Sequence, residues 1–205
     1  MKKLLLTTIA VIALCFSTSA QYQTLFGRGS RVSGFGAPIM EFGQIDDQFS
    51  FMFGGQGGIL VNSFFIGIYG QGLVNEVRPN KLPGYEPNNP NQDYRIGFGH
   101  GGLYIGNSFF SRKAIHLVTS LKTGWGAVAL QQGDTPDFDR DDWSDQVMVI
   151  TPEIGVEMNF TRFMRISLTA GYRFVDGVEL NGYQDSDFQN FTGQLAIQFG
   201  GFSRL

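Results

Sequence analysis

The sequence lacks three features that stabilise or define many exported proteins. Its single cysteine, Cys15, lies in an amino-terminal segment that we expect to be removed, so disulfides do not hold the mature chain together. Only 16% of the residues are charged, against about 25% in an average soluble domain. After that segment, glycine recurs every few residues and no apolar run has the spacing of a helix. These absences exclude a disulfide scaffold and a helical bundle.

Residues 1–20 have the pattern of a secretory signal peptide. Two lysines precede an apolar run from Leu4 to Phe16, and small or hydroxyl residues follow as far as Ala20. The run is too short for a spanning helix, which needs about 20 apolar residues. Residues 21–205 are expected to form one exported domain. It holds 13 basic and 18 acidic residues, a balance that argues against a nucleic-acid partner.

Eight strands are predicted, because apolar residues alternate with small or polar ones over long segments. Most reach the roughly 10 residues with which a tilted strand crosses a bilayer. After the first connection, short and long connections alternate, as they do in outer-membrane barrels. The predicted strands are residues 34–45, 49–61, 64–77, 93–106, 114–130, 147–160, 164–178 and 188–202. We therefore expect an all-β, eight-stranded antiparallel up-and-down transmembrane β-barrel, with both termini on the periplasmic, short-turn side.

The two faces of the strands indicate lipid outside and protein inside. One parity is apolar, whereas the other is dominated by glycine, serine and threonine, which suits the narrow interior of an eight-stranded barrel. A soluble barrel would instead present many lysines and glutamates to water. Near the middle of the membrane, an arginine that faced lipid would cost about 2–4 kcal/mol. Arg165 and Arg173 are therefore expected in the lumen.

Glu153 and Glu157 lie on the neighbouring strand, within reach of Arg165 and Arg173. We predict that these four side chains form a buried charge network that fills the lumen in place of a water channel. Removal of one partner should destabilise the barrel by about 3–5 kcal/mol.

Several motifs resemble a known group of proteins. The segments SGFGAP (33–38), GGQGG (54–58), GHGG (99–102) and FMRISLTAGYRFVDGV (163–178) are similar to those of small outer-membrane β-barrel proteins of Bacteroidota, which are mostly of unknown function. The resemblance covers nearly all of residues 21–205 and implies an outer-membrane location and a barrel fold, without an activity. Such barrels commonly end in an aromatic residue that the assembly machinery recognises. Because this chain ends in Leu205, the resemblance assigns that part to Phe202.

Residues suited to catalysis are few. By parity, His116 is expected in the lumen, and His100 is expected at a β-bulge, since the apolar parity changes between Phe98 and Leu103. Barrel enzymes that deacylate lipid A carry a His-x-Ser pair on one strand, and this sequence has none. No catalytic residue and no cofactor are therefore predicted.

The predicted outer loops hold weaker candidates. Asp137, Asp139 and Asp141 have the spacing that begins a calcium loop, but Asp142 stands where that loop needs glycine, so the alternative is a solvated acidic loop. Four loop aromatics are candidates for contact with a partner or, equally, for packing the loops together: Phe138, Trp143, Tyr85 and Tyr183.

Together these patterns predict a non-enzymatic outer-membrane barrel that is a structural or interaction component of the bacterial envelope. Its expected surroundings are outer-membrane lipid, with a larger envelope protein complex as a candidate partner. One alternative is a lipid-modifying barrel enzyme, which the missing His-x-Ser pair disfavours. Another is a soluble exported barrel that binds a small apolar ligand, which would require the charged face to be exposed to water.

Overall fold

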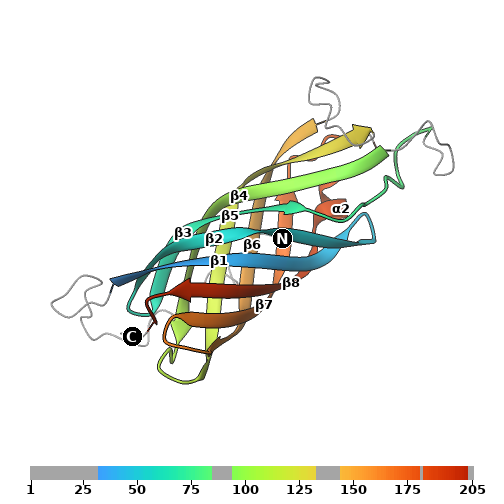
Figure 1. Cartoon of the computed structure of the whole chain (residues 1–205). Coiled ribbons are helices and arrows are strands. Elements are labelled where there is room, and N and C mark those ends of the chain that lie inside the picture. Colours follow the sequence, from blue (N-terminus) through green and yellow to red (C-terminus); the bar gives the residue numbers. More distant parts are fainter. Residues whose placement is uncertain (1–31, 85–93, 133–143, 181, 203–205) are drawn as a thin grey trace, which may run out of the picture. The chain divides into compact units, whose positions relative to one another are not determined.

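The computed structural model describes residues 32–84, 94–132, 144–180 and 182–202. They form a closed barrel of eight antiparallel strands, in which each strand pairs with its neighbours along the chain and β8 pairs with β1 (Figure 1). The predicted eight-stranded up-and-down barrel is confirmed. Its strands are β1 (Val32–Ile45), β2 (Gln48–Val61), β3 (Phe64–Leu73), β4 (Tyr94–Phe109), β5 (Ile115–Gln132), β6 (Ser144–Asn159), β7 (Met164–Asp176) and β8 (Asn190–Gly200).

One short helix, which the sequence pattern did not predict, interrupts this all-β pattern. α2 (Asp185–Phe188) is a single turn between β7 and β8. Its capping box is formed by Gln184 and Asp187 rather than by the serine or threonine and glutamate that usually mark one. No helix in the described part of the chain is long and apolar enough to span a membrane.

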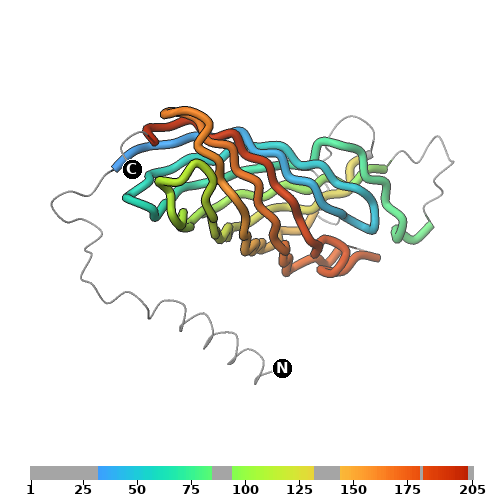
Figure 2. Tube along the Cα trace, turned by 90° about the horizontal axis from the view of Figure 1, so that it is seen from below, coloured from blue at the N-terminus to red at the C-terminus, as the bar shows by residue number. Residues whose placement is uncertain are grey.

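The two ends of the barrel differ in their connections. At the turn end, short turns at residues 62–63, 110–114 and 160–163 join the strands, and β1 begins and β8 ends there (Figure 2). At the loop end, the two-residue turn Asp46–Asp47 lies beside the longer β3–β4, β5–β6 and β7–β8 connections. Both aspartates have positive φ values, 50° and 59°, as a tight hairpin of this twist requires.

Side chains alternate between the lumen and the outer wall along every strand, but the predicted β-bulge at His100 is wrong. β4 pairs with β5 without a break from Tyr94 to Phe109. Ile96, Phe98 and His100 are all buried on the lumen side. The prediction was wrong because it assumed that every apolar residue faces outward, whereas the loop end of the lumen is itself apolar.

Glycine keeps the inside of the wall narrow. A Cβ on Gly58 would lie 2.2 Å from the carbonyl oxygen of Ile66, and one on Gly67 would lie 2.1 Å from that of Gly57, so the close strands leave no room for a side chain. On the outer wall, by contrast, a Cβ on Gly70 would meet nothing within 4 Å.

Candidate functional site

Four buried charges form a cluster in the lumen. They are Glu41 from β1, Lys122 from β5, Glu153 from β6 and Arg173 from β7. Arg173 Nη1 is 2.9 Å from Glu41 Oε1, and Lys122 Nζ is 3.0 Å from Glu153 Oε1. Lys122 Nζ also lies 4.0 Å from Glu41 Oε2, which links the two pairs. Two cations and two anions compensate one another, and burial of charge requires such pairing.

Arg173 is the most completely bonded member of this cluster. Besides Glu41, its guanidinium donates to the carbonyl oxygens of Phe188 at 3.0 Å and Gln44 at 3.1 Å. It also lies over the ring of Phe98, 5.1 Å from the ring centroid. These contacts tie β7 to β1 and to α2, so Arg173 braces the loop end of the barrel from inside.

His100 belongs to the same polar layer. Gln71 Nε2 donates to Glu41 Oε2 at 2.7 Å and lies 3.1 Å from His100 Nε2. Since an amide nitrogen only donates, His100 Nε2 accepts and the ring proton sits on Nδ1, 3.1 Å from Tyr69 Oη. Both ring nitrogens are thus used inside the wall, and His100 is polar filling of the lumen.

A second polar cluster surrounds Glu157 nearer the turn end. Its carboxylate accepts from Ser108 Oγ at 2.9 Å and Gln198 Nε2 at 3.0 Å, and its Oε2 lies 3.0 Å from His116 Nε2. Arg165 Nη1 is farther away, at 3.7 Å. Ser108 and His116 bond the same carboxylate oxygen, and the serine hydroxyl donates to Glu157. The serine-to-histidine bond of a nucleophilic relay is therefore not made between these residues.

Apolar layers close the lumen above and below these polar clusters. At the turn end, the ring of Phe202 lies 4.2 Å from the guanidinium carbon of Arg165, among buried aromatic and aliphatic residues. The turn-end layer contains Leu60, Phe65, Tyr69, Tyr104, Val118 and Phe202. The loop-end layer contains Ile45, Met52, Val77, Ile96, Phe98, Val128, Leu130, Val147, Val149, Val175, Leu180, Tyr183 and Phe188. The lumen is thus a packed core with a polar centre.

The four predicted network residues all lie in the lumen, but most of their partners differ from those expected. Glu157 is near Arg165, whereas Glu153 pairs with Lys122 and Arg173 with Glu41. Strand parity and spacing predict contacts between neighbouring strands only. In so narrow a barrel, long side chains also reach across the lumen, so Glu41 was missed.

The loop candidates have mixed outcomes. Asp137, Asp139 and Asp141 lie outside the described residues, as do Phe138, Trp143 and Tyr85. Among the residues that the structure describes, no group of three or more His, Cys, Asp or Glu could hold a metal ion. Tyr183 is buried at 6% exposure and packs against Phe188, so it joins the loops together rather than offering a contact surface.

Tyr183 is also part of a latch across the loop end. Lys81 Nζ, on the β3–β4 connection, lies 2.5 Å from Asp187 Oδ1 and 3.6 Å from Asp46 Oδ1. Asp46 Oδ2 accepts from the backbone nitrogen of Asn80 and from the Tyr183 hydroxyl. The hydrogen bond to Asp187 raises the pKa of Lys81, and burial raises the pKa of the Tyr183 phenol. Three connections are therefore fastened together here.

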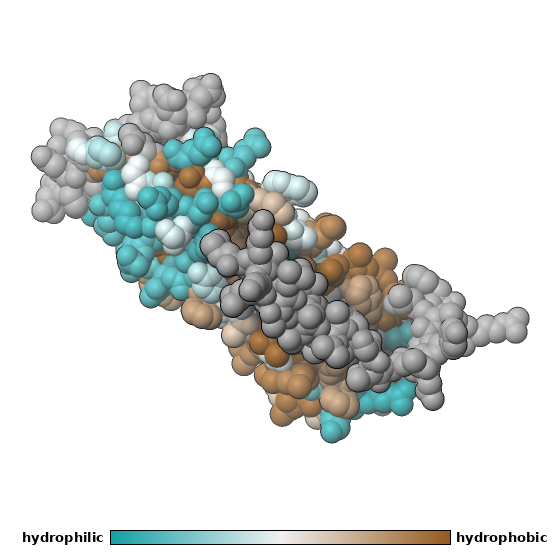
Figure 3. All heavy atoms as spheres, turned by 180° about the vertical axis from the view of Figure 1, so that it is seen from behind, coloured by the Kyte–Doolittle hydropathy of each residue, from teal (hydrophilic) through white to brown (hydrophobic). Residues whose placement is uncertain are grey.

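The outer wall is strongly apolar. In the part of the chain that the structure describes, 25 large hydrophobic side chains are exposed, among them Trp125 at 73%. On the face shown in Figure 3, hydrophobic residues gather towards the turn end and hydrophilic ones towards the loop end. Exposed phenylalanines lie near the turn end, such as Phe64, Phe109, Phe160 and Phe163, and near the loop end, such as Phe49, Phe174 and Phe191.

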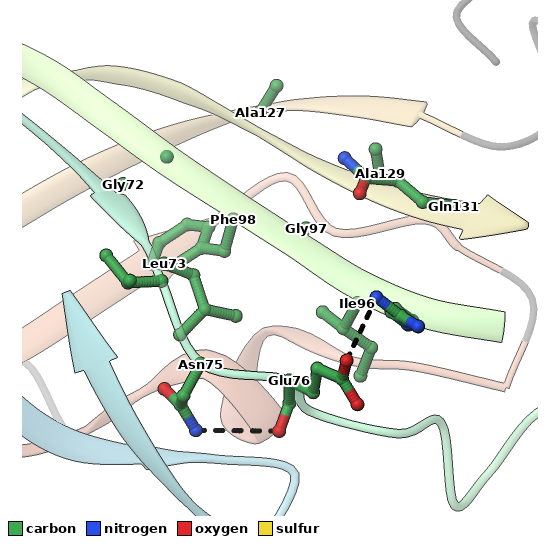
Figure 4. A pocket seen from close by; sticks show the side chains of 13 residues that line it. Gly72, Leu73, Asn75, Glu76, Ile96, Gly97, Phe98, Ala127, Ala129 and Gln131 are labelled. Atoms are coloured by element: carbon green, nitrogen blue, oxygen red, sulfur yellow. Dashed lines mark hydrogen bonds and ion pairs between the residues drawn. The ribbon is translucent and has the colours of Figure 1, made fainter. Parts of the chain in front are cut away.

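A shallow hollow of about 370 Å³ lies on the outer wall over β3, β4 and β5, near the loop end (Figure 4). Small outward residues form its floor, and an ion pair between Glu76 and Arg95, 3.0 Å apart, lies on its rim. Of the described residues that line it, none is a serine, histidine, cysteine or lysine. The floor and rim include Gly72, Gly97, Gly99, Ala127, Ala129, Asn75 and Gln131.

The sequence matches no protein-family model and no curated protein. The fold is similar to that of Neisserial surface protein A, with a TM-score of 0.57 at 10% identity, over 84% of this chain and 98% of that one. It is also similar to the N-terminal β-barrel domain of Pseudomonas aeruginosa OprF, with a TM-score of 0.51 at 10% identity, over 83% and 98% of the two chains. At this identity the likeness is one of fold, and that fold is a small closed β-barrel.

Proposed function

We propose that this protein is a small outer-membrane β-barrel without enzymatic activity, which serves the bacterial envelope as a structural or interaction component. In this proposal the signal peptide predicted at residues 1–20 directs export. The turn end, where β1 begins and β8 ends, faces the periplasm, and the longer connections face outward, as in known outer-membrane barrels.

The observation that carries this proposal is the inverted distribution of polarity across the wall. Lys122 and Arg173 are 0% exposed, whereas Trp125 and Phe191 are 73% and 77% exposed on the outside. A soluble protein rarely exposes a continuous apolar surface of this extent. A bilayer would solvate it, because hydrocarbon tails are as apolar as these side chains.

The same distribution weighs against the soluble ligand-binding barrel. That alternative needs the face with Glu153, Glu157, Arg165 and Arg173 in water, but all four side chains are buried. It also needs an internal cavity for the ligand, whereas buried side chains form an apolar layer at each end of the described lumen and charged residues lie between them. A packed lumen favours a barrel that acts through its wall and loops.

Membrane fractionation combined with a gel tests this proposal. The protein should appear in the outer-membrane fraction, and the unheated sample should migrate faster than the boiled one, as a closed barrel does. A soluble band without this heat shift would contradict the proposal.

Fluorescence quenching tests directly whether the outer wall is in contact with lipid. With Trp143 replaced by phenylalanine, Trp125 is the sole tryptophan, and brominated phospholipid should quench it strongly. The matched variant keeps Trp143, in a predicted outer loop, and replaces Trp125 with phenylalanine; its quenching should be much weaker. Planar-bilayer recordings should show no open-pore conductance of the porin kind, because the lumen is filled.

A further inference from the structure

The turn end of the barrel carries an arc of positive charge. Arg112 and Lys113 lie in the β4–β5 turn and Arg162 lies in the β6–β7 turn, and all three are exposed. The turns at this end, residues 62–63, 110–114 and 160–163, contain no aspartate or glutamate. Apart from the three lumen glutamates, the described acidic residues lie at the loop end: Asp46, Asp47, Glu76, Asp145, Asp176, Glu179, Asp185 and Asp187.

The two basic turns are fastened to each other. Asn159, the last residue of β6, donates through Nδ2 to the carbonyl oxygens of Ser111 at 3.0 Å and Lys113 at 2.8 Å. Its backbone nitrogen donates to the carbonyl oxygen of Ala114 at 2.8 Å. Because one residue bonds three carbonyls of the neighbouring turn, the cations of both turns are held on one arc of the rim.

Exposed aromatic rings are set among these cations. Phe110, Phe160 and Phe163 are 69%, 61% and 60% exposed. Lys113 Nζ lies 5.2 Å from the centroid of the Phe110 ring. Phe110 also has a φ of 61°, a conformation that a bulky residue rarely adopts and that only a constrained turn would retain.

We propose that this arc, formed by Arg112, Lys113 and Arg162 with the rings of Phe110, Phe160 and Phe163, binds the headgroups of anionic phospholipids. The inference rests on the proposed function, because it requires the apolar wall to be in a bilayer. The cations bind the lipid phosphates by charge, and the rings occupy the boundary between headgroups and acyl chains.

The wall directly beside the arc identifies the ligand as a lipid. Beside the two turns, the outer wall is apolar. On β5 it carries Ile115 and Leu117, and on β6 it carries Val156 and Met158, and all four side chains are exposed. A molecule whose anionic group contacts the cations therefore continues along an apolar surface. A phospholipid has this combination of a charged head and apolar tails, whereas an acidic protein segment has only the charge.

Headgroup preference at the arc can be measured with a local fluorescent reporter. Phe160→Trp, in a chain with Trp125 and Trp143 replaced by phenylalanine, puts the sole tryptophan at the arc. The protein is reconstituted into phosphatidylcholine bilayers that contain either brominated phosphatidylglycerol or brominated phosphatidylcholine. Since a basic residue near a membrane surface contributes about a fivefold gain in affinity for anionic lipid, phosphatidylglycerol should associate at least fivefold more strongly, and 0.5 M salt should weaken this preference.

Two triple variants with equal charge change separate the arc from the net charge. Arg112→Gln with Lys113→Gln and Arg162→Gln should bring the association ratio of the two lipids to about one. Arg78→Gln with Lys81→Gln and Arg95→Gln, at the loop end, should leave it unchanged. The inference would be overturned if both triple variants lost the preference for phosphatidylglycerol equally. It would also be overturned if the two lipids quenched the unsubstituted reporter chain equally.

Failure of the inference is distinguishable from failure of the proposed function. If brominated phosphatidylcholine quenches the reporter but phosphatidylglycerol gains nothing, the barrel is in lipid and the arc has no headgroup preference, which would favour an acidic protein segment as its partner. If neither lipid quenches the reporter, and brominated phospholipid does not quench Trp125 in the separate Trp143→Phe chain, the barrel is not in the bilayer, and both proposals are wrong.

Discussion

The two ends of the lumen bury similar charges by different means. At the loop end, Arg173 is held by the carboxylate of Glu41 at 2.9 Å and by two backbone carbonyls. At the turn end, Arg165 is 3.7 Å from its carboxylate partner, and the ring of Phe202 covers its guanidinium. Glu157 there accepts from Ser108 Oγ and Gln198 Nε2 and lies 3.0 Å from His116 Nε2. The loop end therefore depends on a close arginine–carboxylate pair, whereas the turn end depends on several side-chain hydrogen bonds and an aromatic ring over the guanidinium.

Removal of the loop-end carboxylate should have the largest effect. Glu41→Gln leaves Arg173 without its anion in a fully buried site, and it also removes an anion 4.0 Å from Lys122. We expect a loss of about 3–5 kcal/mol in the free energy of unfolding. Unfolding by urea of the barrel in lipid vesicles measures this loss. The folded fraction at each urea concentration is read from the heat shift on gels.

The matched control for Glu41→Gln is Glu76→Gln. Glu76 pairs with Arg95 at 3.0 Å, but its side chain is 53% exposed. A surface pair is worth about 0–1 kcal/mol. Similar losses in the two variants would show that the loop-end pair is not specially dependent on its burial.

Glu157→Gln, at the turn end, should cost less. The amide keeps one acceptor oxygen, but its NH₂ group faces a donor, either Gln198 or the pair Ser108 and His116. At least one buried donor is then left without an acceptor, which costs about 1–3 kcal/mol. This is less than the loss of about 3–5 kcal/mol that the sequence predicted for removal of a network partner, because the Arg165 guanidinium is 3.7 Å from the carboxylate and is covered by Phe202. If Glu157→Gln lowered the free energy of unfolding as much as Glu41→Gln, the two ends of the lumen would not differ in how they stabilise their buried charges. No change in the unfolding midpoint would mean that the turn-end cluster contributes nothing.

The aromatic ring of Phe202 should contribute less again. Phe202→Leu keeps an apolar side chain over Arg165 and removes the ring, so about 0.5–2 kcal/mol should be lost. A double-mutant cycle with Arg165→Met isolates this term, because the ring has no cation to cover in that background. A coupling energy of zero would mean that Phe202 acts only as apolar packing.

Phe202 is the residue to which the resemblance assigns an assembly signal, and that assignment stays a prediction. In the folded barrel its side chain is 7% exposed and packs into the lumen. Any recognition of this ring would therefore have to precede folding of the carboxyl-terminal residues.

The sequence was informative where structure is local. The period of two identified all eight strands and put Arg165, Arg173, Glu153 and Glu157 in the lumen, since alternation depends only on neighbouring residues. It could not supply the pair of Glu41 with Arg173, which are 132 residues apart. That contact depends on the registers of several strand pairs and on the width of the lumen.

The loop end was the least predictable part for a related reason. Ile96 and Phe98 were assigned outward because they are apolar, yet they belong to the layer that closes the lumen. Tyr183 has no periodic neighbours, so sequence pattern alone left open whether it packs the loops or faces a partner. Its burial depends on contacts between loops, and such contacts leave no local signal.

The loop-end latch gives the smallest expected effect. Lys81→Met removes the ion pairs with Asp46 and Asp187 on a side chain that is 41% exposed, so the loss should be about 0–1 kcal/mol at neutral pH and smaller in high salt. Because the hydrogen bond to Asp187 raises the pKa of Lys81 in the folded barrel, protonated Lys81 stabilises the fold at neutral pH. This contribution is fully present below the ordinary lysine pKa and is lost as the pH rises through the raised folded-state pKa. The difference in unfolding midpoint between the parent protein and Lys81→Met should therefore shrink as the pH is raised beyond the ordinary lysine pKa. A difference that persists after Lys81 has lost its proton would mean that Lys81 holds the loops by packing of its aliphatic chain instead of by its charge.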